Sequence, residues 1–468
     1  MTLGVFYSDK YAVEETFQLL KIPWEWYESG KKYDVVIAYK RDLPDFYGHL
    51  IDLTETDYFH EIASLLNKGK NHLHQPQCEI LLDQLRQKIK KFDILVEILP
   101  NPWNHPFMVA LTHDVDLISV RERRWLSVGN AALRCMLQGT FQTGIRIILA
   151  KFQICSDPWE KFTEWMEMEQ NLGIRSTFFF LPASNKPGLF APSVRSGFYS
   201  LEDTPIPTLI KDGWEVGVHG IDNWTSKEKG LEEITFFKKM GLRKIGNRVH
   251  WLMFGDSSWK FLDQAGYYYD SSFGYNNDIG FRAGTLQVYR PAGSKHLLEL
   301  PLHIQDIALF GKSCWELSDN QWIHETCLNL SPNKADTNID ELIGYAKKFG
   351  GVITVLWHYD SITPPKDYGF FYCNLIQKLK DTNSWISTAH NIVTWFLNRR
   401  YLMIDCTSEE KRMIISIKGD FYAENYPLYC LRVHLDPEQI DNVNTDFLRG
   451  SDYIDIKLSK ETILVHLK

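Results

Sequence analysis

The feature that most constrains the fold is a regular alternation of two kinds of segment between about residues 107 and 400. Short runs rich in β-branched and aromatic residues predict strands. These runs are residues 108–112, 176–181, 215–219, 245–251, 267–271, 297–302 and 352–357. Helical spacing characterises residues 203–213, 227–240, 257–266, 337–350 and 384–400. Strands that alternate with helices pair in parallel, so we predict an α/β fold.

About seven such units favour closure into a distorted (β/α)7 barrel, similar to a TIM barrel. The segments before and after the alternation differ from it. The first predicts a small N-terminal α/β domain, because short apolar runs and helical spacing follow one another up to a proline-containing segment at 99–106. The segment after about residue 400 alternates apolar and polar residues, which predicts a small β-rich, sandwich-like domain. The expected domains are residues 1–100, 101–400 and 401–468.

Composition excludes several classes of function. The net charge of −8 argues against nucleic-acid binding, which depends on clustered Lys and Arg. The eight cysteines lie far apart and without a CxxC motif, so neither a disulfide framework nor a thiolate zinc site is expected. The first residues lack a basic flank followed by an apolar run, and no apolar run reaches about 18 residues. We therefore expect a cytoplasmic protein without a transmembrane segment.

Residues 121–152 interrupt the alternation after the first predicted strand of the barrel. The segment is basic and apolar at helical spacing. Two interpretations remain open for it: a helical hairpin packed over the mouth of the barrel, or a helix in peripheral contact with a membrane surface.

Polar residues follow most of the predicted strands. Asp114 and Asp116 end the first, His219 ends the third, Arg248 and His250 lie at the fourth, and Asp306 and His358 follow the last two. The carboxyl ends of barrel strands converge, so these side chains should meet. Carboxylate and imidazole groups suit a divalent metal, with Zn expected and Fe, Co or Ni as alternatives. Such an ion would leave room for water, with a further carboxylate as base and a histidine as acid.

These motifs resemble the polysaccharide deacetylase family, which is the NodB-homology group of carbohydrate esterase family 4. The sequence THDVD at 112–116 stands where that family has TFDDG, and is similar to a divergent branch with HDVD. RSTFFFLP, DGWEVGVHG, NRVHW and VITVLWH resemble the family's later motifs. The resemblance covers about 290 of the 468 residues.

The resemblance implies roles for individual residues. Asp114 corresponds to the base, Arg248 to the residue that orients it, and His358 to the acid, with Asp306 as its partner. Asp116 and His219 correspond to metal ligands. The Trp251 backbone N–H would stabilise the oxyanion, and Arg282 would contact the substrate.

Two departures from the family pattern leave alternatives open. Val115 occupies the family's metal position, so Asp116 must supply the carboxylate. Asn223 replaces the second metal histidine, so the third ligand is His250, Asn223 or Asp222, although the last two residues also suit a turn or a helix N-cap.

The sequence therefore predicts a metal-dependent hydrolase that removes an N-acetyl or other acyl group from an amino sugar or polysaccharide precursor. Two alternatives remain. One is a metal-free hydrolase of cyclic amides or imides with the same fold, and the other is a carbohydrate-binding protein with a decayed site.

Overall fold

A parallel sheet forms the centre of the molecule in the computed structural model, which describes residues 2–43, 46, 48–182, 199–318, 321–420 and 426–468. Its strands are ordered β11-β10-β9-β8-β7-β6-β15-β12, and β16 pairs with β6 beside that path. Their bounds are β6 (Met108–Val115), β7 (Thr177–Phe180), β8 (Glu215–Gly220), β9 (Gly246–Val249), β10 (Tyr269–Asp270), β11 (Leu298–Glu299), β12 (Ile304–Gln305), β15 (Val352–Leu356) and β16 (Trp385–Ser387). Every pairing within this sheet is parallel.

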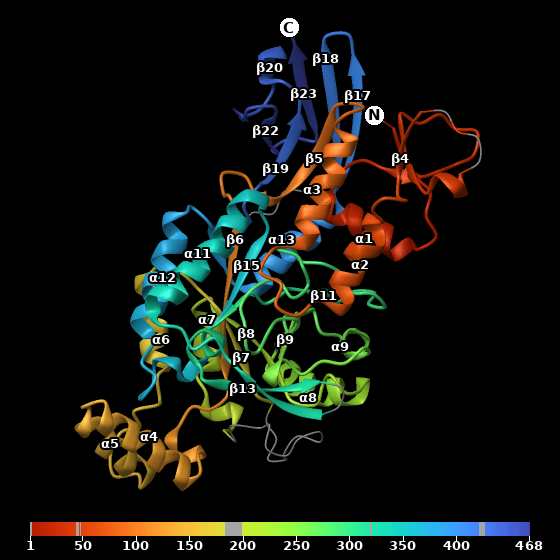
Figure 1. Cartoon of the computed structure of the whole chain (residues 1–468). Helices are drawn as coiled ribbons and strands as arrows, with labels where there is room; N and C mark the ends of the chain where they lie inside the picture. Colours follow the sequence, from red (N-terminus) through yellow and green to blue (C-terminus); the bar gives the residue numbers. More distant parts are fainter. Residues whose placement is uncertain (1, 44–45, 47, 183–198, 319–320, 421–425) are drawn as a thin grey trace.

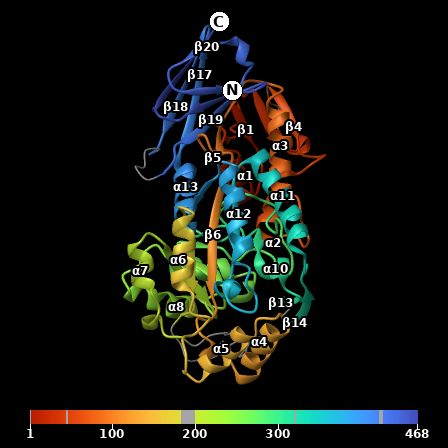
Figure 2. The same cartoon turned by 90° about the vertical axis from the view of Figure 1, so that its left-hand side faces the viewer.

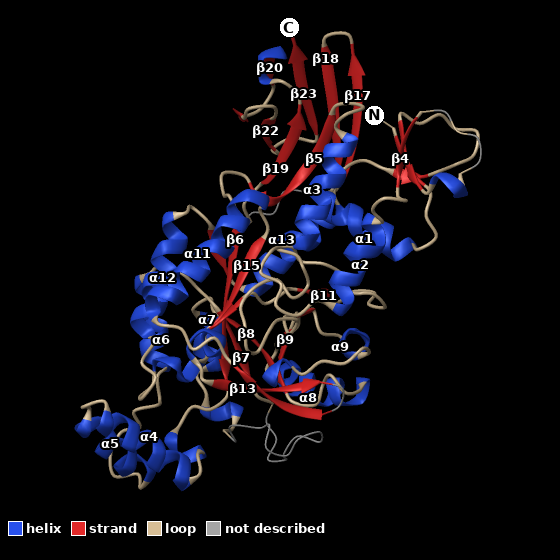
Figure 3. Cartoon of the chain, in the orientation of Figure 1, coloured by secondary structure: helices blue, strands red, loops and turns tan. Residues whose placement is uncertain are grey.

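The α/β prediction is confirmed as a parallel half-barrel. Within the described residues, the terminal strands β11 and β12 are not paired with each other. Helices lie against the outside of the sheet (Figure 1, Figure 3). They are α6 (Phe162–Asn171), α7 (Ile206–Lys211), α8 (Lys227–Lys239), α9 (Ser258–Ala265), α11 (Pro332–Phe349), α12 (Gly369–Asp381) and α13 (Ala389–Tyr401). A further short helix, α10 (Asp306–Phe310), directly follows β12.

The prediction of one helix over residues 384–400 is wrong at its start. Trp385, Ile386 and Ser387 form β16 and pair with the first half of β6. Helix α13 begins only after Thr388, whose side chain accepts a hydrogen bond from the Asn391 backbone N–H. The aromatic and β-branched residues before this N-cap fit a strand, and pairing with β6 outweighs their helical spacing.

The two ends of the chain form further sheets. Near the N-terminus, β2 (Glu25–Trp26), β1 (Leu3–Val5), β3 (Val35–Ala38) and β4 (His49–Asp52) make a parallel sheet in that order, beside α1 (Lys10–Leu20), α2 (Tyr58–Lys68) and α3 (Gln77–Ile89). Near the C-terminus lie two antiparallel sheets. One contains β17 (Met403–Glu409), β18 (Arg412–Lys418), β23 (Thr462–Leu467) and β20 (Ile440–Val443). The other contains β21 (Phe447–Arg449), β22 (Ile454–Lys457), β19 (Tyr429–His434) and β5 (Leu95–Pro102).

Strand β5 connects the first part of the chain to the last. It lies within the segment expected to end the N-terminal domain, yet it pairs antiparallel with β19 over residues 95–102. The chain then passes directly from β5 into β6 at the centre of the half-barrel. The C-terminal sheets are thereby joined to the half-barrel through β5 as well as through α13.

Residues 121–152 form a helical hairpin of α4 (Trp125–Leu137) and α5 (Phe141–Lys151). In both views it lies at the end of the molecule opposite β17, β18 and β23 (Figure 1, Figure 2). Two strands, β13 (Ser313–Ser318) and β14 (Gln321–Thr326), form a separate antiparallel hairpin. None of the helices in the described part of the chain is long and apolar enough to cross a bilayer.

A buried carboxylate holds the central strands to the helices outside them. Glu169 of α6 accepts hydrogen bonds from the Ser176 hydroxyl, the Trp214 indole N–H and the Tyr372 hydroxyl, at 2.8, 2.6 and 2.9 Å. It also lies 2.8 Å from Nε2 of His113 on β6. These contacts join α6, the starts of β7 and β8, α12 and β6 in one fully buried cluster.

We expect Glu169→Leu to lower the free energy of unfolding by about 3–5 kcal/mol, because it leaves four buried polar groups without their acceptor. Denaturation by urea, followed by tryptophan fluorescence, measures the change. Glu167→Leu is the matched control, because Glu167 lies exposed on the same helix and should shift stability by about 0.5 kcal/mol or less. Equal effects of the two substitutions would contradict the assigned role of Glu169.

Candidate active site

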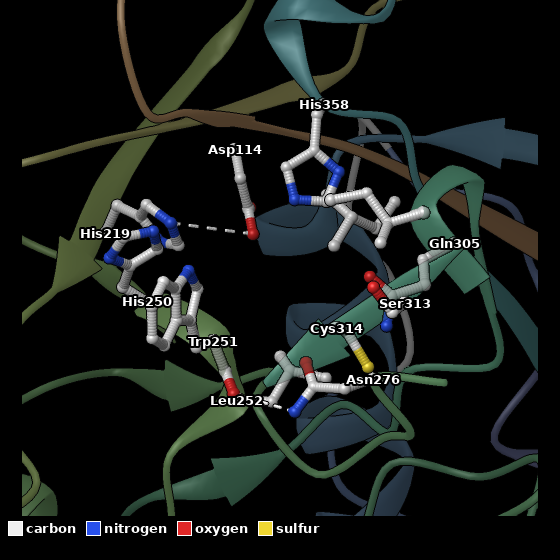
Figure 4. A pocket seen from close by; sticks show the side chains of 12 residues that line it. Asp114, His219, His250, Trp251, Leu252, Asn276, Gln305, Ser313, Cys314 and His358 are labelled. Atoms are coloured by element: carbon white, nitrogen blue, oxygen red, sulfur yellow. Dashed lines mark hydrogen bonds and ion pairs between the residues drawn. The ribbon is translucent and has the colours of Figure 1, made fainter. Parts of the chain in front are cut away.

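Side chains from several strand ends meet around a cavity of about 210 Å³ at the carboxyl edge of the half-barrel. Asp114, His219, His250, Trp251 and His358 line it. Asp114 and His358 come from neighbouring strands, and Figure 4 shows His219 and His250 on one side of Asp114 and His358 on the other. The remaining lining residues are Leu252, Asn276, Gln305, Ile307, Ser313, Cys314 and Leu356.

Alternation along β6 places Asp114 at the cavity, and Asp116 follows the strand directly. Asp114 and Asp116 are two residues apart, so they lie on one face of the extended chain. His113 points the other way, where its Nδ1 lies 2.7 Å from the Trp357 carbonyl oxygen and its Nε2 contacts Glu169. His113 is therefore a structural residue, in agreement with its position on the opposite face of the strand.

Asp116, His219 and His250 form a cluster whose ligand atoms all lie within 4.8 Å of one another. Asp116 Oδ1 is 3.0 Å from His219 Nε2 and 3.3 Å from His250 Nε2. Both histidines are almost fully buried. Burial alone would raise the pKa of Asp116, but the two histidines outweigh it and hold this pKa well below its usual range.

The hydrogen bond on the far side of His219 shows that this cluster fits a divalent metal. Its Nδ1 donates to the Arg248 carbonyl oxygen at 2.9 Å, which leaves Nε2 facing Asp116. A bare imidazole nitrogen and a carboxylate oxygen repel each other unless a proton or a cation lies between them. Two imidazoles and one carboxylate, with one imidazole oriented from behind, are the donor set expected of a catalytic zinc site.

The other two candidates for the third ligand lie elsewhere. The Asn223 amide donates to Asn247 Oδ1 at 2.6 Å and to the Tyr267 hydroxyl at 3.1 Å, so it belongs to a separate buried network. The backbone of Asp222 receives a hydrogen bond from Thr225 and donates one to Glu233. Neither residue caps α8, because Ser226 is its N-cap. Among the three candidates, the structure brings only His250 to Asp116 and His219.

A left-handed turn follows β9 and sets the wall of the cavity. Trp251 and Leu252 have φ values of 59° and 49°, a backbone conformation rare for such bulky residues. The Trp251 carbonyl oxygen accepts a hydrogen bond of 2.8 Å from the Asn276 amide. Strain of this kind clusters at functional sites, and here it places Trp251 at the cavity directly after His250.

Arg248 lies behind Asp114 and is fully buried. Its Nη1 is 3.6 Å from Asp114 Oδ1, and its Nη2 donates to the Ser271 hydroxyl at 2.9 Å. Asp114 Oδ1 is itself buried and accepts no hydrogen bond from the described residues. A buried oxygen of this kind, next to a fixed positive charge, is free to interact with a bound molecule.

His358 and Asp306 form a pair on the opposite side of the cavity. Asp306 Oδ1 is 2.6 Å from His358 Nδ1, and Oδ2 accepts the His358 backbone N–H at 3.0 Å and the Ser361 hydroxyl. Burial would lower the pKa of His358, but the carboxylate of Asp306 outweighs it and raises this pKa to about 9. His358 is thus held as a proton donor at neutral pH.

Arg282 is not brought to the cavity. Its guanidinium donates to the Gly274 carbonyl oxygen at 2.8 Å and lies over the Phe273 ring, 4.9 Å from its centroid. Arg282 braces the loop after β10, and its expected contact with a substrate stays a prediction. Sequence reasoning missed Asn276 and Gln305. Asn276 lines the cavity from a loop and Gln305 from the two-residue strand β12, and neither segment has a recognisable motif.

Comparison with known proteins gives a likeness of fold only. No family model matches the chain, and no curated protein matches it. Among solved structures, a protein from Mycobacterium smegmatis provisionally described as a polysaccharide deacetylase is 17% identical, with a TM-score of 0.41. The match covers 67% of this chain and 100% of that one.

Two further solved structures match the chain with lower sequence identities and TM-scores. One, from Bordetella bronchiseptica, is provisionally described as a polysaccharide deacetylase involved in O-antigen biosynthesis. It is 14% identical with a TM-score of 0.28, covering 54% of this chain and 72% of that one. A GH57 branching enzyme from Thermococcus kodakaraensis is 10% identical with a TM-score of 0.33, covering 62% and 71%. Because these proteins differ in activity, the likeness assigns no reaction to this chain.

We expect the purified protein to bind about one equivalent of a transition metal, and Asp116→Ala, His219→Ala and His250→Ala each to lose it, because each removes one of three ligands. Elemental analysis of protein prepared without chelator measures the content. Asn223→Ala is the control and should retain the metal. Loss of metal in Asn223→Ala with retention in His250→Ala would contradict the assignment of the third ligand.

Proposed function

We propose that the protein is a metal-dependent hydrolase that removes an N-acetyl or similar acyl group from an amino sugar or polysaccharide precursor. The observation that carries the proposal is the convergence on one cavity of a metal-type cluster, a buried carboxylate and a histidine–carboxylate pair. These are the groups that hydrolysis of an amide requires: a site for the carbonyl oxygen and water, a base and an acid.

Asp116, His219 and His250 would hold the metal, with Zn expected from the nitrogen and oxygen donors. A divalent ion at this position supplies Lewis acidity, which polarises a carbonyl oxygen and makes water more acidic. The hydrogen bond from His219 Nδ1 to the Arg248 carbonyl keeps the imidazole oriented for this role.

Asp114 would accept the proton of the attacking water. Its Oδ2 lies 3.8 Å from His219 Nε2, which places the carboxylate beside the metal cluster without making it part of that cluster. The guanidinium of Arg248 lies 3.6 Å from Asp114 Oδ1, and the hydrogen bond from Arg248 to Ser271 fixes the guanidinium. Asp114 is therefore suited to act as the general base.

His358 would donate a proton to the leaving amine from the other side of the cavity. Asp306 stabilises its protonated form and fixes the ring through Nδ1, so that Nε2 carries the proton that is transferred. Collapse of the tetrahedral intermediate then breaks the carbon–nitrogen bond and releases the carboxylic acid and the free amine. The Trp251 backbone N–H is proposed to stabilise the oxyanion.

The lining of the cavity supports a carbohydrate as the substrate. Trp251 offers an aromatic ring, and the amides of Asn276 and Gln305 offer donors and acceptors of the kind that bind hydroxyl groups. The lining suits a sugar and the catalytic groups suit hydrolysis of an amide, so together they favour an acylated amino sugar as the substrate. The convergence of three metal-type ligands favours this function over a metal-free amide hydrolase, and the intact base and acid favour it over a decayed binding protein.

We expect Asp114→Asn and His358→Ala each to lower kcat by about 10²–10⁴-fold, because each removes a group that transfers a proton. Release of acetate from N-acetylglucosamine oligosaccharides by the metal-loaded protein measures the rate. Asp212→Asn and His60→Ala are controls, since both residues are exposed and far from the cavity lining. If the unsubstituted protein is active, an unchanged rate in Asp114→Asn or His358→Ala would exclude the proposed mechanism.

The pH profile tests the pair of Asp306 and His358. Because His358 must be protonated to act as the acid, kcat/KM should fall as the pH rises through about 9. Asp306→Asn removes the charge that raises this pKa, so the alkaline limb should move to lower pH. Ser361→Ala keeps that charge and should leave the limb near its wild-type position. An alkaline limb that stays unchanged in Asp306→Asn would contradict the role of this carboxylate.

A further inference from the structure

Exposed apolar side chains are concentrated in the α4–α5 hairpin. Of the 17 large hydrophobic residues exposed in the described part of the chain, eight lie between residues 125 and 154. They are Trp125, Leu126, Leu133, Leu137, Phe141, Ile145, Phe152 and Ile154, all at least 52% exposed. An apolar surface of this extent in so short a segment marks a site of interaction.

Helix α4 is apolar on two opposite faces. Val128, Ala131 and Cys135 are buried in a small core that the hairpin forms. Leu126, Leu133 and Leu137, spaced seven and four residues apart, lie on the opposite side and are 78%, 54% and 79% exposed. A helix that needed only to pack against its neighbour would carry polar residues on this second face.

Helix α5 repeats this arrangement. Phe141 and Ile145 share a face, because they are spaced four residues apart, and Phe152 is the C-cap of the helix. Each of the three is more than half exposed. At one end of the hairpin the Phe152 ring contacts Trp125, with ring centroids 4.8 Å apart. At the other end, Leu137 and Phe141 flank the short turn between the helices. The exposed apolar residues of the two helices thus lie close together at both ends.

The hairpin is strongly basic in a chain that is acidic overall. Residues 121–152 contain six basic residues and one acidic residue, whereas the whole chain has a net charge of −8. The basic residues are Arg121, Arg123, Arg124, Arg134, Arg146 and Lys151. Lys151 also lies over the Trp125 ring, 5.5 Å from its centroid. Apolar residues bordered by basic ones, with a tryptophan between them, complement a bilayer surface that carries negative headgroups.

The position of the hairpin relates this surface to the cavity. Helix α4 begins nine residues after Asp116, at the carboxyl edge of β6. The hairpin extends away from the half-barrel at that edge (Figure 1, Figure 2) and contributes no residue to the lining of the cavity. It therefore lies at the same edge of the half-barrel as the cavity without forming part of the lining.

We propose that the α4–α5 hairpin binds the surface of a lipid bilayer containing anionic headgroups, with its exposed Leu and Phe side chains in the interface and its arginines at the headgroups. The hairpin would hold the carboxyl edge of the half-barrel next to the bilayer. Resting on the proposed function, this orientation suits an acyl amino sugar that is anchored in the same membrane.

Sedimentation with vesicles of phosphatidylcholine, with and without phosphatidylglycerol, tests the proposal on the full-length protein. We expect wild-type protein to bind the vesicles that contain phosphatidylglycerol, and less tightly as salt increases. Leu133→Glu with Leu137→Glu should weaken this binding at least tenfold, because two side chains leave the interface. Leu448→Glu is the matched control, since Leu448 is 55% exposed in β21, and should bind as wild type.

A second variant tests the charge without changing an apolar residue. Arg124→Gln with Arg134→Gln should weaken binding about 30-fold at low salt, since each basic residue near such a surface contributes about 1 kcal/mol. Hydrolysis of a soluble N-acetylated oligosaccharide should be unchanged in every variant. Absence of that activity in wild type, with vesicle binding intact, would overturn the proposed function alone.

Three results would overturn the membrane proposal. The first is no binding of wild-type protein to phosphatidylglycerol vesicles. The second is equal binding by Leu133→Glu/Leu137→Glu and wild type. The third is a dimer in solution that this double variant dissociates, because the apolar surface would then be covered by a second copy of the chain.

Discussion

The alternation of side chains along β6 is the constraint on which the candidate site depends. This strand lies at the centre of the half-barrel, paired with β7 on one side and β15 on the other. Asp114 lines the cavity and Asp116 contacts two of its lining histidines, whereas His113, directly before Asp114, is fixed on the opposite side by Glu169 and the Trp357 carbonyl. A shift of one residue in the register would exchange these faces and put a histidine where the carboxylates belong.

The charges around the cavity are arranged in matched pairs. Arg248 lies behind Asp114, His219 and His250 contact Asp116, and Asp306 contacts His358. Each pair lowers the cost of burying its members. The pKa of Asp116 is lowered and that of His358 is raised, as their proposed roles need. The two carboxylates and the protonated histidine occupy different walls, so a substrate bound between them meets a base on one side and an acid on the other.

Much of this arrangement could be predicted from the sequence, because polar residues at the carboxyl ends of parallel strands must lie near one another. The identity of the third ligand could not, since it depends on the left-handed turn after β9 and on the contacts that draw Asn223 towards Asn247 and Tyr267. The pairing of strands that lie far apart in the sequence could not be predicted either. Residues 385–387 have helical spacing but pair with β6, and β5 crosses to a sheet formed by the last part of the chain.

The central claim is that Asp116, His219 and His250 hold a divalent metal beside Asp114. Anomalous diffraction from crystals of the zinc-loaded protein, recorded on either side of the zinc absorption edge, tests it most directly. We expect one peak at the cavity, about 2.0–2.2 Å from a carboxylate oxygen of Asp116 and from the Nε2 atoms of His219 and His250. A zinc ion located elsewhere, or one coordinated by Asn223 in place of His250, would contradict the assignment of this metal site.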